Sequence, residues 1–382
     1  MTSTPLWAPS DTLAAALPGA GKRAGPSRAK RGSPRKAAAG SDAGQNQAAA
    51  AGAIELAAAI VAVSGDEPLV EVLAESSGQT SDRLPSALFQ LDAGPHLEDS
   101  LRVPIENMTG HVLGYMQQLF AFVQPAGARS HILVGYLALV HDERRSGRVR
   151  GQSARRSRAS RWHGCYEYLP WEDWRAGRPA LVDRVLIPQL TAWVRSGQPS
   201  LSKAALARLQ SERATRARLA FGSPSLPWEE DKVLSRFDLL VEAGIIAEER
   251  QSGVRVPATK SKRTDTAEER ASNPAFGRVM FPGHRRILAG AIGRLRADLK
   301  TRPIVFELMD EEFSLYELQQ TVEAILGPNL HKQNFRRLIE TAGLVEPTGR
   351  MKSHTGGRPA KLFRFRRDVM LERPAPGLKI RN

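Results

Sequence analysis

Two different spacings of apolar residues divide the chain into parts. In the first third, residues 54–73 form two apolar runs around Ser64-Gly65-Asp66, and residues 115–140 form two more around Pro125-Ala126-Gly127. Runs of this length on either side of turn residues predict two β-hairpins. Three consecutive alanines at residues 57–59 keep a helix open as the alternative for the first run.

Helical spacing takes over after about residue 180. Apolar residues recur every three or four positions in residues 180–194, 200–221 and 229–246, which predicts three amphipathic helices. Pro188 is expected to kink the first, and Gly244 to end the third. Residues 251–274 are polar and are expected to form a loop.

A compact set of signals follows near the C-terminus. Ser314 with Glu317 three positions later is a capping box, which predicts a helix start. Gly327-Pro328-Asn329 then ends this helix and turns the chain. The apolar positions Leu315, Leu318, Val322 and Ile325 lie on one face of the predicted helix.

A second short helix, at about residues 332–341, is expected to bury Phe335, Leu338 and Ile339. A strand and a glycine-rich basic hairpin follow, so the segment is typical of a winged helix-turn-helix. An α-helix fits the major groove, where Arg, Asn and Gln bond base edges, and cations on a flexible hairpin reach phosphate. The alternative is a solvated basic helix in a structural domain. The predicted DNA-binding residues are Lys332, Gln333, Asn334, Arg336, Arg337, Arg350, Lys352, Arg358 and Lys361.

The charge distribution supports a polyanionic partner. The 382 residues carry a formal net charge of +15 with a pI of about 10.4. Residues 330–382 hold 13 Lys and Arg against 4 acids, and residues 144–161 hold eight arginines and no acid. Residues 1–52 are basic and poor in large apolar side chains, so we expect a disordered tail.

Other features limit the class of protein. No apolar run approaches the length of about 20 residues that spans a bilayer, and no signal-peptide pattern opens the sequence. The single cysteine, Cys165, excludes an internal disulfide. We therefore expect a cytoplasmic protein with no membrane partner.

The sequence also resembles a known family. The pieces HRRIL, PIVFEL, LHKQNFRR and GRPAKLFRF, within residues 281–365, are similar to the C-terminal half of the Nudix-related transcriptional regulators of NAD metabolism, with the alphaproteobacterial branch the most alike. The resemblance implies a Nudix-like sensor of ADP-ribose or a related nucleotide (NAD or ATP), no required cofactor, a homodimer, and operator DNA near NAD biosynthesis or salvage genes.

The Nudix hydrolase motif is degenerate in this chain. If Gly110 takes the final glycine of the motif, the two adjacent glutamates that should bind Mg²⁺ become Asn107 and Met108. Pro104 is expected to interrupt the helix, so that nearby carboxylates cannot rebuild the missing face; these are Glu98, Asp99 and Glu106. We therefore predict no metal site, no catalytic residues and no enzyme activity.

An aromatic stretch after the arginine-rich segment is the candidate nucleotide site. Aromatic rings stack on adenine and arginines bind pyrophosphate, although packing in a core is the favoured explanation of these rings. The predicted ligand-binding residues are Arg155, Arg156, Arg161, Trp162, His163 and Tyr166.

The predicted fold class is α+β. We expect a basic tail (1–52), a Nudix-like mixed α/β sensor domain (53–200), a helical connection (201–279), a winged helix-turn-helix (280–370) and a flexible tail (371–382). The predicted function is a DNA-binding transcriptional regulator of NAD biosynthesis or salvage genes that responds to a nucleotide. We expect it to act as a repressor. A divergent Nudix hydrolase with a nucleic-acid-binding appendage is the alternative. A DNA-binding protein whose Nudix-like part serves only for dimerisation also stays open.

Overall fold

The computed structural model describes residues 53–73, 81–89, 96–126, 129–141, 160–197, 200–246, 276–352 and 359–368. The predicted N-terminal and C-terminal tails and the whole predicted loop at 251–274 lie outside these residues. So do Arg155, Arg156 and Arg358.

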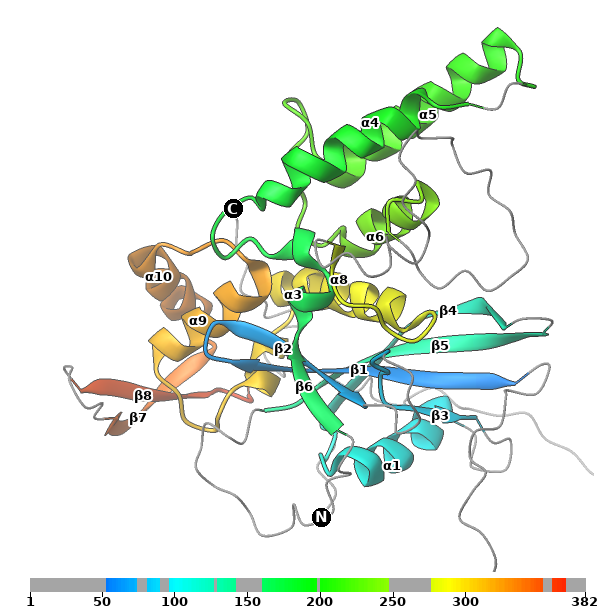
Figure 1. Cartoon of the computed structure of the whole chain (residues 1–382). Coiled ribbons are helices and arrows are strands. Elements are labelled where there is room, and N and C mark those ends of the chain that lie inside the picture. Colours follow the sequence, from blue (N-terminus) through cyan, green and yellow to red (C-terminus); the bar gives the residue numbers. More distant parts are fainter. Residues whose placement is uncertain are drawn as a thin grey trace, which may run out of the picture.

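A six-stranded mixed sheet occupies the first half of the described chain (Figure 1). Its strand order is β4-β5-β1-β2-β6, and β3 pairs with β1 beside this path. β1 runs parallel to β5, and the other pairs are antiparallel. The strands are β1 (Ile54–Ser64), β2 (Glu67–Leu73), β3 (Ser86–Leu88), β4 (Tyr115–Ala126), β5 (Arg129–Leu139) and β6 (Ser160–Gly164).

Both predicted hairpins are confirmed, as β1–β2 and β4–β5. The helical alternative for the alanine run is wrong: Ala57, Ala58 and Ala59 are fully buried in β1 at the centre of the sheet. Alternate alanines contact the layers on opposite faces, so tertiary burial overrides their helix propensity.

Helices cover both faces of the sheet. Helix α1 (Leu97–Thr109) packs on one face through Leu101 and Ile105, and α8 (His284–Thr301) packs on the other. Gly135 of β5 lets α8 come close, since a Cβ there would lie 3.0 Å from a methyl carbon of Ile287. Helix α1 also continues through Pro104, which corrects our expectation that this proline interrupts it.

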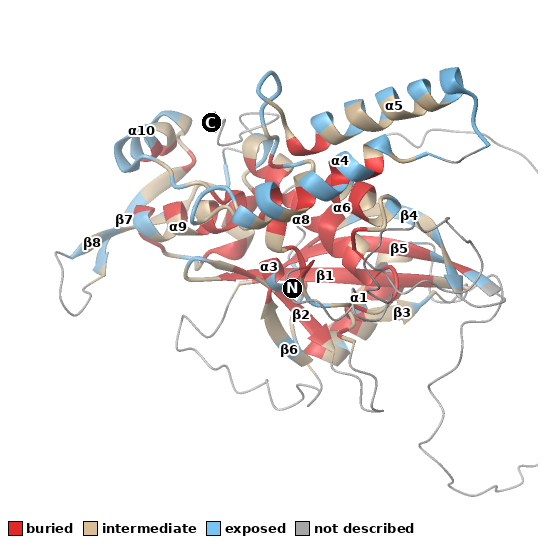
Figure 2. Cartoon of the chain, turned by 45° about the horizontal axis from the view of Figure 1, so that its top comes forward, coloured by how far each residue is buried: buried red, intermediate tan, exposed pale blue. Residues whose placement is uncertain are grey.

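The predicted helices of the middle region are confirmed, with one local change. A π-helical turn (Val182–Leu186) precedes α4 (Ile187–Arg195), so Pro188 lies in the first turn of α4, where no N–H is needed. Helix α5 (Lys203–Phe221) begins at its N-cap Ser202, and α6 (Val233–Glu242) ends just before Gly244. Helix α5 projects from the body and is largely exposed (Figure 2).

The C-terminal elements form a helix-turn-helix with a two-stranded wing. They are a 3-10 helix (Ile304–Leu308), α9 (Leu315–Leu326), α10 (Lys332–Ala342), β7 (Val345–Lys352) and β8 (Ala360–Phe365). The predicted fold class, α+β with a C-terminal winged helix, is thus confirmed. One hydrophobic cluster runs from Ala57 of β1 to Leu344 before β7. Helix α8 contacts both the sheet and α9, and the expected domain boundaries stay predictions.

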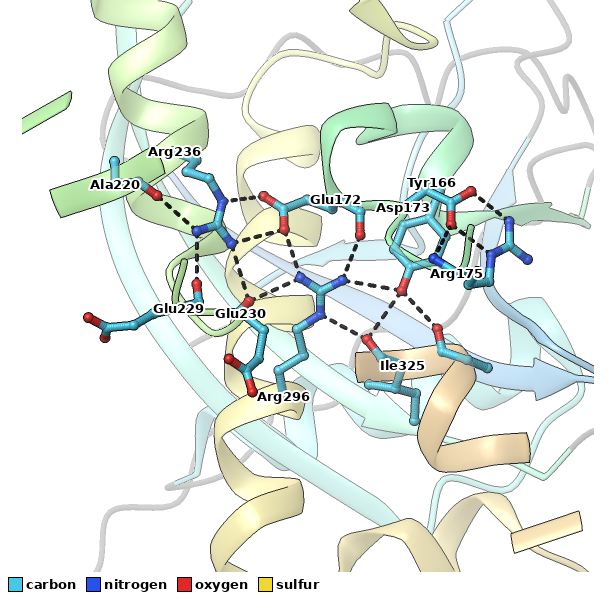
Figure 3. Close-up of polar contacts among 11 residues, drawn as sticks. Tyr166, Glu172, Asp173, Arg175, Ala220, Glu229, Glu230, Arg236, Arg296 and Ile325 are labelled. Carbon is cyan, nitrogen blue, oxygen red and sulfur yellow. Dashed lines mark hydrogen bonds and ion pairs between the residues drawn. The ribbon is translucent and has the colours of Figure 1, made fainter. Parts of the chain in front are cut away.

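A buried ionic cluster joins the helical layers (Figure 3). Glu172, in a 3-10 turn (Pro170–Glu172), is fully buried and receives hydrogen bonds from Arg236 Nε at 2.6 Å and Arg296 Nη1 at 2.7 Å. Arg236 Nη2 also donates to Glu172 Oε2 at 3.0 Å, and Arg296 Nη2 donates to the Tyr166 hydroxyl at 3.2 Å. Further guanidinium hydrogen bonds of 2.8–3.3 Å reach the backbone carbonyls of Glu172 itself, Ala220, Glu229, Glu230 and Ile325. Every buried charge in this cluster is therefore hydrogen-bonded.

Replacing the shared carboxylate should be costly. Glu172→Gln leaves two buried guanidiniums without a counter-charge, and removing one partner of a buried ion pair costs about 3–5 kcal/mol. We expect the free energy of unfolding, measured by urea denaturation, to fall by that amount. The control is Asp183→Asn, whose ion pair with Arg178 is largely exposed and should contribute less than about 1 kcal/mol. Equal losses in the two variants would contradict a structural role for Glu172.

Candidate functional site

Helix α10 has one buried face and one polar face. Phe335 and Ile339 are buried and Leu338 is half-buried, as predicted from their spacing. The predicted DNA-contacting side chains on the opposite side are all exposed; they are Lys332, Gln333, Asn334, Arg336 and Arg337. The polar face therefore presents three cations and two amides to solvent.

The start of helix α9 is fixed by its capping box. The Ser314 side chain accepts from Glu317 N at 3.2 Å, and the Glu317 carboxylate accepts from Ser314 N at 2.9 Å. This prediction is confirmed, and the box fixes the first of the two helices.

The turn between α9 and α10 is held by residues that sequence reasoning missed. Gln319 Nε2 donates to the carbonyl of Leu330 at 2.8 Å, and Leu330 N donates to Glu323 Oε1 at 2.7 Å. Gly327 has φ +98, and a Cβ there would lie 2.7 Å from Trp174 Cβ. The sequence signal for this arrangement was the spacing of Gln319 and Glu323, because residues four apart lie on one side of a helix.

The wing cations are engaged in different ways. Arg350 Nη1 lies 3.0 Å from Glu312 Oε2, and Lys352 Nζ lies 2.7 Å from Glu317 Oε1. Lys361 is exposed, and the described residues offer it no ion-pair partner. The sequence prediction treated these cations alike and missed the two acids that pair with Arg350 and Lys352.

The structure separates the predicted ligand-binding residues. Arg161, Trp162 and His163 follow one another in β6, so their side chains alternate between the two faces of the sheet. Trp162 makes an edge-to-face contact with His111, while His163 lies against Tyr168 on the other face. Arg161 is exposed.

Tyr166 lies in the interior. Its hydroxyl donates toward the carbonyls of Ala324 and Ile325 at 2.8 and 3.2 Å and accepts from Arg296 Nη2 at 3.2 Å. Because the hydroxyl is fully engaged within the protein and the side chain is buried, we remove Tyr166 from the candidate ligand site.

A buried carboxylate beside Trp162 was missed. Glu71 of β2 is fully buried; Ser160 Oγ donates to its Oε1, and His111 Nε2 lies 3.3 Å from its Oε2. An acid in the apolar run Leu69–Leu73 was the only available signal. Glu71, His111, Ser160 and Trp162 thus form a polar site on the α1 face of the sheet, next to the C-terminal end of α1.

The other face holds a second buried acid, Glu55, which lies 3.0 Å from Arg83, 3.3 Å from His131 and 3.5 Å from His284. Burial alone would raise the pKa of Glu55, but the hydrogen bond from His284 and the charge of Arg83 hold it well below 4.5. Burial lowers the pKa of His284, despite the opposing effect of Glu55. Leu84 N donates to His284 Nδ1 at 3.0 Å, so the ring proton lies on Nε2, toward Glu55.

The hydrolase positions carry no metal-binding acids. Asn107 is exposed on α1, and Met108 packs against the sheet. Of the nearby carboxylates, Glu106 accepts from Leu113 N and Glu98 pairs with Arg102. In the described ranges no group of three or more His, Cys, Asp or Glu is arranged to hold a metal ion. No helix among the described residues is long and apolar enough to cross a membrane.

Comparison with known proteins identifies the C-terminal segment. Residues 305–365 match the family described as the NrtR DNA-binding winged helix domain. This segment is therefore similar to that domain family in sequence as well as in its helix-turn-helix and wing. A stretch of 82 residues is also 42% identical to the ADPR responsive transcriptional repressor NtrR of Acinetobacter baylyi. That match covers 22% of this chain, and the chain spans about a third (32%) of the length of the curated relative.

Solved structures resemble a larger part of the chain. Shewanella oneidensis NrtR complexed with a 27mer DNA has a TM-score of 0.46 and 15% identity, over 83% of this chain and 94% of that one. A MutT/nudix family protein from Enterococcus faecalis has a TM-score of 0.41 and 12% identity, over 85% and 90% of the two chains.

The Glu55 cluster predicts a loss of stability in acid. The unfolded chain protonates His284 below its usual pKa of about 6.5 and Glu55 below about 4.5, while the folded chain resists both. Since the unfolded state then binds more protons, stability falls as pH falls, by up to about 1.4 kcal/mol per pH unit for each proton. Urea denaturation between pH 7.5 and 5 measures this slope.

The matched variant is His284→Gln, which keeps a donor but does not titrate. It should be less stable than the wild type at pH 7.5 and show a shallower decline between pH 6.5 and 5. The other histidines are present in both proteins, so their contributions cancel. Parallel curves for the two proteins would contradict the assignment.

Proposed function

We propose that this chain is a cytoplasmic, homodimeric repressor that binds operator DNA and responds to ADP-ribose or a related adenine nucleotide. Its target genes would be those of NAD biosynthesis or salvage. The observation that carries the proposal is the exposed polar face of α10, within the segment that matches the NrtR DNA-binding winged helix domain. The partly matching relative from Acinetobacter is named an ADPR responsive transcriptional repressor, which supports the choice of effector.

The chemistry of α10 supports sequence-specific contacts. Gln333, Asn334 and Arg337 are exposed on a helix whose Phe335 and Ile339 anchor it to α9 and the rest of the core. Arg bonds the guanine edge in two places, and Asn or Gln does so with adenine. Phosphate contacts from the wing would set orientation without reading sequence.

The sensor would use the polar site on the α1 face. Trp162 offers an aromatic surface for a base, and Glu71 with His111 offers acceptor and donor groups to hydroxyls. We propose binding without hydrolysis, because Asn107 and Met108 stand where the motif places metal-binding acids. A hydrolase would need such acids to neutralise phosphate charge.

A route for the signal runs through buried contacts. Strand β6 leads directly into helix α3 (Cys165–Tyr168), where the Tyr166 hydroxyl bonds the last turn of α9. Arg296 bonds Ile325 in the same turn. A change at β6 on ligand binding would therefore be transmitted to the turn that positions α10.

Substitutions on α10 and on the wing should have different effects. Gln333→Ala or Arg337→Ala should weaken operator binding by about 1–3 kcal/mol more than binding to random DNA, since base contacts discriminate sequence. Lys361→Ala should weaken both and reduce the salt dependence by about 0.9 in log–log slope. Fluorescence anisotropy across a salt series, with a duplex selected by the wild-type protein and a shuffled duplex, measures both effects.

Thermal stability separates these effects from unfolding. The three exposed substitutions should leave the Tm almost unchanged, whereas Phe335→Ala removes a buried ring and should cost about 3–5 kcal/mol. If the α10 and wing variants are indistinguishable, or if operator affinity does not change, α10 is not the recognition helix.

Nucleotide sensing is tested on the full chain, because α8 completes the core of the sheet. We expect calorimetry to detect binding of ADP-ribose, NAD or ATP, and Trp162→Ala to weaken it by removing the aromatic surface for the base. Arg208→Gln, on exposed α5, is the control and should bind like the wild type. With Mg²⁺ the nucleotide should be recovered intact; turnover of even about one per second would rule out a non-catalytic sensor. Absence of binding by all three nucleotides would refute the sensor assignment.

A further inference from the structure

The wing carries a bulge that redirects one of its cations. The β7–β8 register shifts between Pro347 and Met351, and Gly349 has φ +75, the left-handed conformation that favours glycine. Arg350 N lies 3.3 Å from Thr348 Oγ1, which orders the bulge. The bulge leaves Arg350 beside Glu312, and Lys352, two residues along the same strand, beside Glu317.

Glu312 lies in the segment between the 3-10 helix and α9, and Glu317 lies in the first turn of α9. Phe313 exchanges backbone hydrogen bonds of 2.8 and 2.9 Å with Phe363 of β8, so Glu312 is held against the wing by main-chain pairing. Besides pairing with Lys352, Glu317 accepts the backbone hydrogen bond of Ser314 in the capping box. Burial alone would raise its pKa, but Lys352 and Ser314 hold it below the usual value, so it remains a carboxylate.

A carboxylate and a phosphate compete for the same guanidinium, because both accept charge-assisted hydrogen bonds. The Arg350 side chain is 73% exposed and that of Glu312 30% exposed, so the ion pair lies at the surface, where a closely placed phosphate can replace the carboxylate. Lys361, in contrast, has no described acid to displace. The two kinds of cation therefore differ in how readily they bind any DNA backbone.

We propose that Glu312 is a specificity-determining residue: its carboxylate holds Arg350 away from the phosphates of random DNA and releases it only in the operator complex. This inference rests on the proposed DNA-binding function. On random DNA the wing is not held at a fixed place over the phosphate backbone, and the Glu312–Arg350 ion pair persists. When α10 is seated on its base sequence, the wing is fixed over the backbone, and a phosphate replaces Glu312 as the partner of Arg350.

The sequence provides a matched control. Glu311 is exposed, is adjacent to Glu312 and carries the same charge, but it makes no ion pair with a described residue. Glu312→Gln and Glu311→Gln therefore change the net charge identically, and only the first frees Arg350. Each is made in the wild-type protein and in an Arg350→Gln background, and affinity for the selected and shuffled duplexes is measured by anisotropy from 50 to 200 mM salt.

We expect Glu312→Gln to steepen the salt dependence of binding to shuffled DNA by about 0.9 in log–log slope. The gain in affinity of this variant over Glu311→Gln should therefore be about three- to fourfold larger at 50 mM than at 200 mM salt. The slope for selected DNA should stay unchanged, because Arg350 already contacts phosphate there, and the ratio of the two affinities should fall. Both effects should disappear in the Arg350→Gln background.

Three outcomes would overturn the proposal. If the Glu311 and Glu312 variants behave alike, the change in net charge alone explains the effect. If the effect persists in the Arg350→Gln background, Arg350 is not the cation that Glu312 controls. A lower Tm for Glu312→Gln without a gain in affinity for shuffled DNA would make the ion pair structural. If no duplex can be selected because the wild-type protein binds no DNA, the proposed function itself fails; binding with unchanged slopes rejects only the role of Glu312.

Discussion

One buried carboxylate, Glu172, pairs with guanidiniums from two different helices, Arg236 of α6 and Arg296 of α8. It neutralises one of two buried guanidiniums, which leaves a surplus positive charge in the interior. Two of the carbonyls that receive Arg236 and Arg296 belong to the last turns of α5 and α9. The C-terminal ends of helices carry partial negative charge, so these helix ends offset the surplus. The cluster therefore fixes where two helices stop relative to the sheet.

This constraint ties the DNA-reading elements to the sheet. The last turn of α9 receives hydrogen bonds from both Arg296 and Tyr166, and the next residues form the turn into α10. Packing interfaces made of polar networks have discrete arrangements, because a partly broken network leaves buried donors unpaired. An effector that moves α3 would thus act on the helix pair as a unit and would not loosen it gradually.

The sequence predicted local features well and distant ones poorly. The hairpins, the capping box of Ser314 and the two faces of α10 follow from residues within one or two turns of each other. Glu172 pairs with Arg296, 124 residues further along the chain, and in sequence neither differs from a solvated surface charge. The same holds for Glu71 with His111. Pro104 was misjudged for the opposite reason: packing of α1 on the sheet outweighs one lost backbone hydrogen bond.

The position of α8 also affects how the chain is made. The helix covers one face of a sheet whose first strand is synthesised some two hundred residues earlier, so that face stays open to solvent until residues near 300 have left the ribosome. At about 5–20 residues per second, this interval lasts on the order of ten seconds or more. During that time the apolar surface of β1 and β5 is exposed to other chains. The order of synthesis thus creates a period in which this face can associate with other chains, and the finished structure does not show it.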